Sequence, residues 1–345
     1  MQNLHANIYG AGSWSQAIAH VLVKNINQIT VIYRNDNNFV KSGANKKINF
    51  SNDLLSSINS NNDPLIVCSP VSSLKDLGEN LKKIKFSRPV LLCCKGIESN
   101  TGKFPSEILE EFISLDQIAI LTGPSFSDEV LNDKPTAVII SGQKAQVIEL
   151  FTTMFHSINF RVYNSNDVIG CQLGGALKNI LSIAVGIAEG LKLGANAKAA
   201  LISRGILEMK YLGDKVQCDP LTIFGLSGLG DLVLTANDDL SRNRSFGIKI
   251  GEGLPIEDSA NSVGKTIEGI NASKGLSVLT RKYSLDLPIC NKVFEIIQKK
   301  GISVDKSKNL YEAIEIASQN KLNVCICGSL YLAGEFLKNN QTIPN

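Results

Sequence analysis

The sequence has little of what several common catalytic mechanisms require. It contains only three histidines among 345 residues, and His5, His20 and His156 lie far apart and outside any motif. A Ser/His/Asp or Cys/His mechanism therefore has little support. Long apolar runs are also missing, because the most apolar stretch, residues 180–188, has about half of the roughly 20 residues that a bilayer span needs. We expect no membrane span, and any acid or base must be another side chain.

The sequence also has no large excess of basic residues, no cysteines at zinc-binding spacing and no signal-peptide pattern. The 35 basic and 32 acidic residues nearly balance, so the basic excess of a nucleic-acid-binding protein is missing. The eight cysteines lie mostly in apolar segments, and the close pair Cys325 and Cys327 lacks partners at zinc spacing. We expect buried thiols and no metal. The N-terminus lacks the basic and apolar regions of a signal peptide, which predicts a globular, cytoplasmic protein.

The N-terminal half of the sequence alternates short apolar segments with longer mixed ones. This alternation is typical of strands joined by crossover helices in a parallel sheet. The predicted strands are Leu4–Tyr9, Ile29–Tyr33, Leu65–Cys68, Val90–Cys94, Ile118–Thr122 and Thr136–Ser141. The sequence thus predicts an α/β protein in which residues 1–167 form an N-terminal Rossmann-like, doubly wound sheet that binds a dinucleotide.

After residue 167 the pattern changes to long helical segments. The predicted helices are Val168–Leu191, Ala195–Leu212, Gly275–Tyr283, Leu287–Lys299 and Tyr311–Asn320. Residues 225–243 are rich in Gly, Ser, Asp and Asn, which predicts a functional loop. We expect residues 168–345 to form a C-terminal all-helical domain that binds the substrate.

Small and polar residues follow four of the predicted strands. The four segments are Gly10–Trp14, Ser69–Ser73, Lys95–Glu98 and Gly123–Phe126. In open α/β sheets, ligands bind beyond the carboxyl ends of the strands. These four turns should therefore share one crevice.

The first of these turns has the pattern of a pyrophosphate-binding turn. Gly10 would permit the tight turn, and Gly12 would let the backbone approach a diphosphate at the N-terminus of a predicted helix, Gln16–Lys24. The third position of the pattern is Ser15 rather than glycine, where a small side chain preserves close packing of helix on strand. Taken alone, the segment is equally compatible with an ordinary glycine-rich turn.

The second predicted strand bears on the choice of nucleotide. It is followed by Arg34, where an NAD site usually has an acidic residue. A guanidinium suits the 2′-phosphate of NADP, so we favour NADP slightly over NAD. Asp36 nearby keeps NAD open, and a solvated surface arginine is the alternative interpretation.

Residues 168–188 form a predicted apolar helix with one charged residue, Lys178. A lysine removed from water has a lowered pKa, which makes proton donation to a developing alkoxide feasible. Gly174, one turn earlier, would leave open space beside the ammonium. Gly174 and Gly175 each cost about 1 kcal/mol in a helix interior, which suggests that something approaches this face closely. The alternative is a lysine that snorkels at a domain boundary.

Further polar groups are spread along the chain. Lys95 directly follows a buried predicted strand, so its charge should project into the crevice, and Gly123–Ser125 offers backbone N–H and hydroxyl groups to an anion. The segments Gly228–Asp231 and Ser241–Arg244 add an arginine fork with hydroxyl and amide donors, which suits a phosphate. Each segment alone is more often a surface turn, so only the combination favours a phosphate site.

Six blocks in this order resemble the bacterial-type NAD(P)-dependent glycerol-3-phosphate dehydrogenases. The blocks are Gly10–Trp14, Cys94–Glu98, Gly123–Phe126, Leu173–Asn179, Gly228–Leu232 and Leu240–Arg244. The resemblance implies reversible reduction of dihydroxyacetone phosphate to sn-glycerol 3-phosphate with NAD(P)H, a supply of phospholipid precursors, and a homodimer.

The resemblance also implies roles for individual residues. Lys178 matches the proton donor/acceptor, with Lys95 and Asp231 shaping the field around it. Substrate-contacting positions match Lys95, Gly123, Ser125, Lys178, Asp231, Ser241, Arg242 and Asn243. Cofactor contacts match Gly10, Gly12, Ser13, Trp14, Arg34, Lys95, Ser127, Arg242, Thr266 and Glu268.

This sequence departs from the family pattern at three of its positions. Ser15 and Ser127 stand where the family more often has Gly and Ala, and Thr266 replaces an apolar residue. Two rival functions remain open. One is an NAD(P)-dependent β-hydroxyacid dehydrogenase, whose usual Ser-Gly-Gly turn is not evident, and the other is a non-catalytic nucleotide sensor of the same fold.

Overall fold

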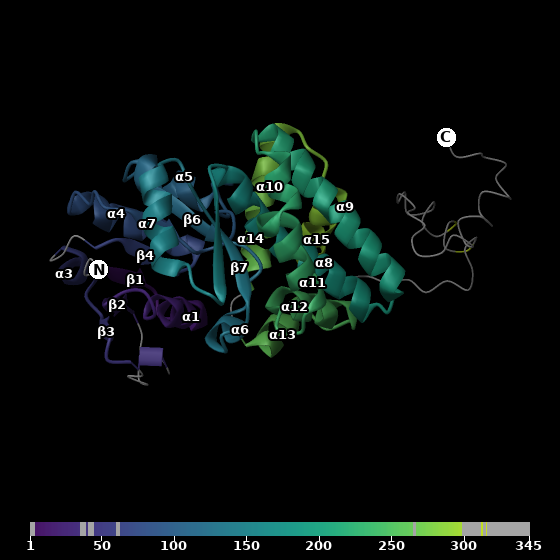
Figure 1. Cartoon of the computed structure of the whole chain (residues 1–345). Helices are drawn as coiled ribbons and strands as arrows, with labels where there is room; N and C mark the ends of the chain where they lie inside the picture. The colour runs from purple at the N-terminus through teal and green to yellow at the C-terminus, as the bar shows by residue number, and fades with distance from the viewer. Residues whose placement is uncertain are drawn as a thin grey trace.

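The computed structural model describes residues 4–34, 39–40, 45–59, 63–264, 267–298, 312 and 315. Within them, an N-terminal sheet with helices on its faces lies beside a C-terminal group of helices (Figure 1). The predicted helix Tyr311–Asn320 falls outside the described residues except at Glu312 and Glu315. Residues Asp36, Thr266, Cys325 and Cys327 also fall outside them.

Eight strands form a single sheet in the order β3-β2-β1-β4-β5-β6-β7-β8. Their bounds are β1 His5–Tyr9, β2 Gln28–Ile32, β3 Ile48–Ser51, β4 Leu65–Val67, β5 Val90–Leu92, β6 Ile118–Thr122, β7 Thr136–Gly142 and β8 Phe160–Ser165. Helices that cover the two faces of this sheet are α1 Ser13–Leu22, α3 Leu54–Asn59, α4 Leu74–Lys83, α5 Pro105–Leu109, α6 Ser127–Leu131 and α7 Ala145–Phe155. The apolar side chains on the two faces form separate buried clusters, so the predicted doubly wound α/β sheet is confirmed.

The sequence predicts a parallel sheet, but the sheet in the structure is mixed. Strand β7 pairs antiparallel with β6, whereas the other neighbouring pairs are parallel. A parallel return needs a crossover of a dozen or more residues that contains a substantial helix. The only helix between β6 and β7 is α6, which has five residues and is too short to carry the chain back along the sheet.

Two strands of the sheet, β3 and β8, were not predicted from the sequence. Both lie at the edges of the sheet, and neither is buried along its whole length. Edge strands that are open to water need no continuous apolar run, so the pattern that revealed the inner strands was absent from these two.

Helices make up the described part of the C-terminal half, and the first two of them are the longest. The α-helices are α8 Val168–Gly190, α9 Gly194–Lys215, α10 Pro220–Phe224, α11 Asp231–Asn237, α12 Arg242–Gly251, α13 Ile256–Val263, α14 Glu268–Tyr283 and α15 Pro288–Gln298. By length and composition α8 could cross a membrane, but 89% of its most apolar window is buried inside the protein. Helix α8 is thus the core around which the other helices pack, and no other helix in the described part of the chain passes this test.

The prediction of a loop at residues 225–243 was wrong. The chain there forms a π-helix, Leu226–Gly230, followed directly by α11 and, after a short turn, by α12. The glycines that suggested a loop instead allow close backbone packing, because a Cβ on Gly228 would lie 2.0 Å from the carbonyl oxygen of Ile223.

Glycines also bring α8 and α12 into backbone contact. Gly186 and Gly190 on α8 face Gly247 and Gly251 on α12, and a Cβ on any of them would lie 2.2–2.4 Å from a carbonyl oxygen of the other helix. The spacing of four residues in both pairs places each pair on one helix face. Helix α12, which begins at the cavity described below, is thereby held directly against α8.

Gly247→Ala should destabilise the protein by about 2–3 kcal/mol, because the new methyl group must push the backbone of α8 away. Gly213→Ala is the matched control in α9, since its Cβ would meet nothing closer than 3.6 Å. That control should be neutral or more stable by up to about 1 kcal/mol. Chemical denaturation of the full chain measures both, and equal effects would contradict the close-packing argument.

Candidate active site

One cavity of about 440 Å³ lies between the sheet and the helices of the C-terminal half. It is lined by residues from the turns after four strands: Ser13 and Trp14 after β1, Ser69–Ser72 after β4, Lys95–Ser99 after β5, and Ser125–Asp128 after β6. Residues of α8, α12 and α14 close its other side. The predicted meeting of the four turns in one crevice is confirmed.

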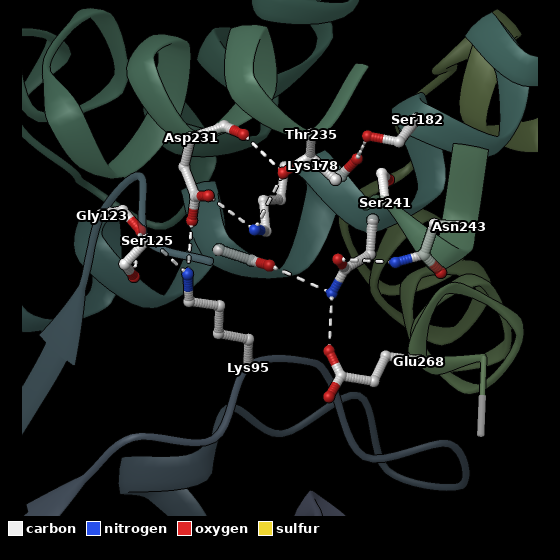
Figure 2. Close-up of polar contacts among 12 residues, drawn as sticks. Lys95, Gly123, Ser125, Lys178, Ser182, Asp231, Thr235, Ser241, Asn243 and Glu268 are labelled. Atoms are coloured by element: carbon white, nitrogen blue, oxygen red, sulfur yellow. Dashed lines mark hydrogen bonds and ion pairs between the residues drawn. The ribbon is translucent and has the colours of Figure 1, made fainter. Parts of the chain in front are cut away.

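Lys178 lines this cavity from the middle of α8 and is only 8% exposed. Its Nζ donates hydrogen bonds to Asp231 Oδ1 at 2.6 Å and to Thr235 Oγ1 at 3.0 Å, both on α11 (Figure 2). Burial lowers the pKa of Lys178 to about 8, against the opposing effect of the Asp231 carboxylate. Lys178 is therefore a desolvated ammonium at the cavity wall rather than a snorkelling one.

Lys95 reaches the same carboxylate from the opposite side. Its Nζ lies 2.5 Å from Asp231 Oδ2 and 3.1 Å from the carbonyl oxygen of Gly123. The Asp231 side chain is fully buried, so the two ammonium groups take up both of its oxygens (Figure 2). Asp231 thus sits behind the two lysines and does not itself line the cavity.

The two glycines before Lys178 do something other than open space beside it. A Cβ on Gly174 would lie 2.4 Å from the carbonyl oxygen of Ser227, so Gly174 admits the π-helix that leads into α11. A Cβ on Gly175 would lie 3.4 Å from the Lys95 side chain. The expectation of open space was wrong, because the neighbours that approach this face belong to the protein itself.

An amide network joins three helices beside Lys178. Asn243 on α12 donates to Asn179 Oδ1 at 2.9 Å and accepts from the backbone N–H of Gly269 at 3.0 Å. Asn179 in turn donates to Glu268 Oε2 at 3.3 Å. The cavity face of α8 is therefore fixed relative to the first turns of α12 and α14.

The residues of the segment Ser241–Arg244 have different surroundings. Ser241 caps α12 by accepting from the Arg244 N–H at 3.2 Å, and the exposed Arg242 lines the cavity. Arg244 points elsewhere and pairs with Glu189 at 2.5 Å and Asp239 at 2.6 Å. Of the two arginines in the predicted fork, Arg242 lines the cavity and Arg244 does not.

The glycine turn after β1 fits a dinucleotide diphosphate. Gly10 has φ +109°, and a Cβ on it would crowd the backbone of Cys68 and Ser69, whereas Gly12 has open space beside it. Helix α1 begins with no side-chain cap and no acidic residue in its first turn, so its N–H groups and dipole favour an anion. Ser15, the small residue at the third position, lies in the first turn of α1 and is only 1% exposed.

The remaining predicted site residues lie around this cavity or outside it. Ser125, Ser127 and Glu268 line the cavity, and Ser125 Oγ donates to the Gly123 carbonyl at 3.1 Å. Arg34 is exposed and does not line it; its guanidinium instead donates to the Tyr9 hydroxyl at 2.8 Å.

Thr235 also belongs to the site, although the sequence had not predicted it. Its hydroxyl accepts from Lys178 and donates to the Asp231 carbonyl oxygen at 2.7 Å. Asp231 and Thr235 are four residues apart, a spacing that places both on one helix face. The four-residue spacing is visible in the sequence, but it places two residues together only in a helix. The sequence predicted a loop for this segment.

A doubly wound sheet with a glycine turn at its first strand, facing a buried lysine across one cavity, defines a dinucleotide-dependent dehydrogenase. Two family models match this chain: the N-terminal domain of NAD-dependent glycerol-3-phosphate dehydrogenase over residues 6–148 and its C-terminal domain over residues 167–330. The chain belongs to the NAD-dependent glycerol-3-phosphate dehydrogenase family.

Individual relatives agree with this assignment. The glycerol-3-phosphate dehydrogenase [NAD(P)+] of Thermoanaerobacter sp. (strain X514) is 36% identical over 321 residues, which cover 89% of this chain and 94% of the relative. That of Halorhodospira halophila is 35% identical, covering 84% and 91%. The crystal structure of the Coxiella burnetii glycerol-3-phosphate dehydrogenase superposes with a TM-score of 0.81 at 30% identity, covering 86% of this chain and 95% of that one.

Asp231→Asn should destabilise the fold by about 3–5 kcal/mol, because it leaves the buried ammonium of Lys178 and the part-buried ammonium of Lys95 without their shared carboxylate. It should also move the pKa of Lys178 below about 8, since the carboxylate raises that pKa. Asp239→Asn is the matched control: this carboxylate also pairs with a cation, but it is 97% exposed and should change stability by less than about 1 kcal/mol. Thermal unfolding compares the two variants, and similar losses would contradict the role given to Asp231.

Proposed function

We propose that this chain reversibly reduces dihydroxyacetone phosphate to sn-glycerol 3-phosphate with NAD(P)H, using Lys178 as the proton donor. The observation that carries the proposal is a buried lysine of lowered pKa at the wall of the cavity that the strand-end turns share. An ammonium with a pKa near the working pH is an efficient general acid. Family membership supports the same reaction.

When bound, the reduced nicotinamide supplies the hydride that converts the ketone carbon to an alcohol. Lys178 donates its proton to the substrate oxygen and takes it back in the reverse direction. Asp231 and Thr235 each accept a hydrogen bond from Lys178, which fixes the direction of the remaining N–H. The nearby Lys95 adds positive charge where the oxygen becomes negative.

The substrate phosphate fits the cationic side of the cavity. Arg242 offers a guanidinium, with Ser241 and Asn243 beside it, and all three line the cavity. Lys95 and Ser125, whose contacts both include the Gly123 carbonyl, would hold the other end of the substrate. Binding energy from the phosphate would thus orient the ketone for reaction.

The cofactor would lie across the carboxyl ends of the strands. Its diphosphate would bind at Gly10 and Gly12, next to Ser13 and Trp14. Glu268 and Ser127, together with Lys95 and Arg242, line the path toward Lys178. Arg34 would meet a 2′-phosphate, which favours NADP slightly over NAD. The proposed contact between Thr266 and the cofactor is supported only by the resemblance to the family.

The chain would form two domains. Residues 1–167 would bind the dinucleotide, and residues 168–345 would bind the substrate. The support for this boundary is that the last strand of the sheet ends at Ser165 and the long helix α8 begins at Val168. We further propose that the protein acts as a cytoplasmic homodimer and supplies glycerol 3-phosphate for phospholipid synthesis. Membership of the glycerol-3-phosphate dehydrogenase family supports the production of glycerol 3-phosphate.

Lys178→Met should lower turnover by about 100-fold or more, because it removes the proton donor but keeps the bulk of the side chain. Nucleotide affinity should stay within about two-fold of the original, since the hydrogen bonds of Lys178 go to Asp231 and Thr235 on α11 and not to the glycine turn. Steady-state kinetics and a nucleotide titration measure the two properties. Near-normal turnover in this variant would refute the assignment.

The two reaction directions should depend on pH in opposite ways. Ketone reduction needs the Lys178 ammonium, so kcat/KM should be constant below pH about 8 and fall above it. Alcohol oxidation needs the neutral amine, so its kcat/KM should rise up to pH about 8 and then level off. Initial rates from pH 6 to 10 in both directions provide the check, and parallel profiles would rule out Lys178 as the titrating group.

Direct spectrophotometry separates this function from its rivals. The purified protein should oxidise NADPH or NADH when dihydroxyacetone phosphate is added, and a β-hydroxyacid should not serve as substrate in the reverse direction. A non-catalytic sensor would bind the nucleotide without turnover. Binding without any oxidation would therefore favour the sensor.

A further inference from the structure

Tyr9 is the last residue of β1 and directly precedes the glycine turn. Its ring is buried with Ile32 and Val67 in the cluster on one face of the sheet, and the residue is only 5% exposed. The hydroxyl reaches out of this cluster and accepts a hydrogen bond from Arg34 Nη2 at 2.8 Å. A fixed apolar ring therefore carries a polar atom to the carboxyl end of the sheet.

Arg34 follows β2 and is exposed. Its guanidinium carbon lies 5.9 Å from the centre of the Tyr9 ring. The N–H of Gly10 donates to the carbonyl oxygen of Ile32 at 2.9 Å, so the end of β2 is tied to the start of the glycine turn. Arg34 is thus held next to the segment that faces the diphosphate.

An exposed arginine has many side-chain conformations, and binding a ligand with it means giving up that freedom. The hydrogen bond to Tyr9 uses one of the five guanidinium donors and restricts the direction of the rest before any ligand arrives. Such preorganisation increases affinity by lowering the ordering cost.

We propose that Tyr9 is a positioning residue that sets the preference for 2′-phosphorylated nucleotides by holding Arg34 at the end of the sheet. The proposal rests on the proposed function, which places a dinucleotide at the glycine turn. It goes beyond that function because it assigns part of the nucleotide specificity to a buried side chain that does not touch the ligand.

The hydroxyl of Tyr9 can be removed without disturbing the fold. Tyr9→Phe keeps the buried ring, and its former partner Arg34 is exposed and turns to water, so no buried polar group loses its hydrogen bond. Tyr33→Phe is the matched control, because it deletes a hydroxyl from the residue adjacent to Arg34 in sequence.

The experiment titrates the intrinsic fluorescence of Trp14, the only tryptophan in the chain and part of the cavity wall. The ligands are adenosine 2′,5′-bisphosphate and NADP+, compared with 5′-AMP and NAD+. Tyr9→Phe should weaken binding of the two 2′-phosphorylated ligands by about three- to ten-fold, the value of one hydrogen bond. Binding of 5′-AMP and NAD+ should stay within about two-fold, and Tyr33→Phe should change nothing.

Arg34→Ala separates failure of this inference from failure of the proposed function. If Arg34→Ala selectively weakens the 2′-phosphorylated ligands but Tyr9→Phe weakens neither or both classes equally, the positioning role is wrong while the nucleotide site stands. If Arg34→Ala has no selective effect, Arg34 does not read the 2′-phosphate, and the inference about Tyr9 falls with it. If none of the four ligands binds the original protein, the nucleotide site itself is wrong.

Discussion

The site depends on one buried carboxylate that two ammonium groups share. Asp231 is fully buried, and its two oxygens bind Lys95 from the sheet half and Lys178 from the helical half. Two cations facing one cavity would repel each other without it, and burial already lowers the pKa of Lys178 to about 8. The carboxylate keeps both charges in place, and at the same time it ties the sheet to the helices. Chemistry and architecture therefore rest on the same three residues.

Backbone contact between helices gives this arrangement its precision. Gly174 admits the π-helix that leads directly to Asp231, and the glycine pairs of α8 and α12 hold the start of α12 beside the cavity. Glycine lowers the stability of a helix. At these positions the loss is offset by the close approach of neighbouring helices. The same helix α8 carries Lys178 at the centre of its buried face. A side chain on so confined a helix has little freedom to change its position relative to the cavity.

Much of this could be predicted from local sequence patterns. The inner strands were visible because strands buried on both faces are continuous apolar runs, and Lys178 stood out because it is the only charge among residues 168–188. Edge strands β3 and β8 lacked that pattern. The segment from Leu226 to Asn237 was assigned to a loop because composition cannot distinguish glycines that permit a turn from glycines that permit close packing. Thr235 was missed for the same reason.

The sequence by itself determined the α/β class, the glycine turn, and which charged residues lie in apolar surroundings. Each of these is a property of a short stretch of chain. Only the tertiary structure decided that Lys95 and Lys178 meet at Asp231, that Arg242 rather than Arg244 faces the cavity, and that Tyr9 holds a guanidinium. Those partners are brought together by packing between distant segments, and no local pattern encodes the distance or direction of such contacts.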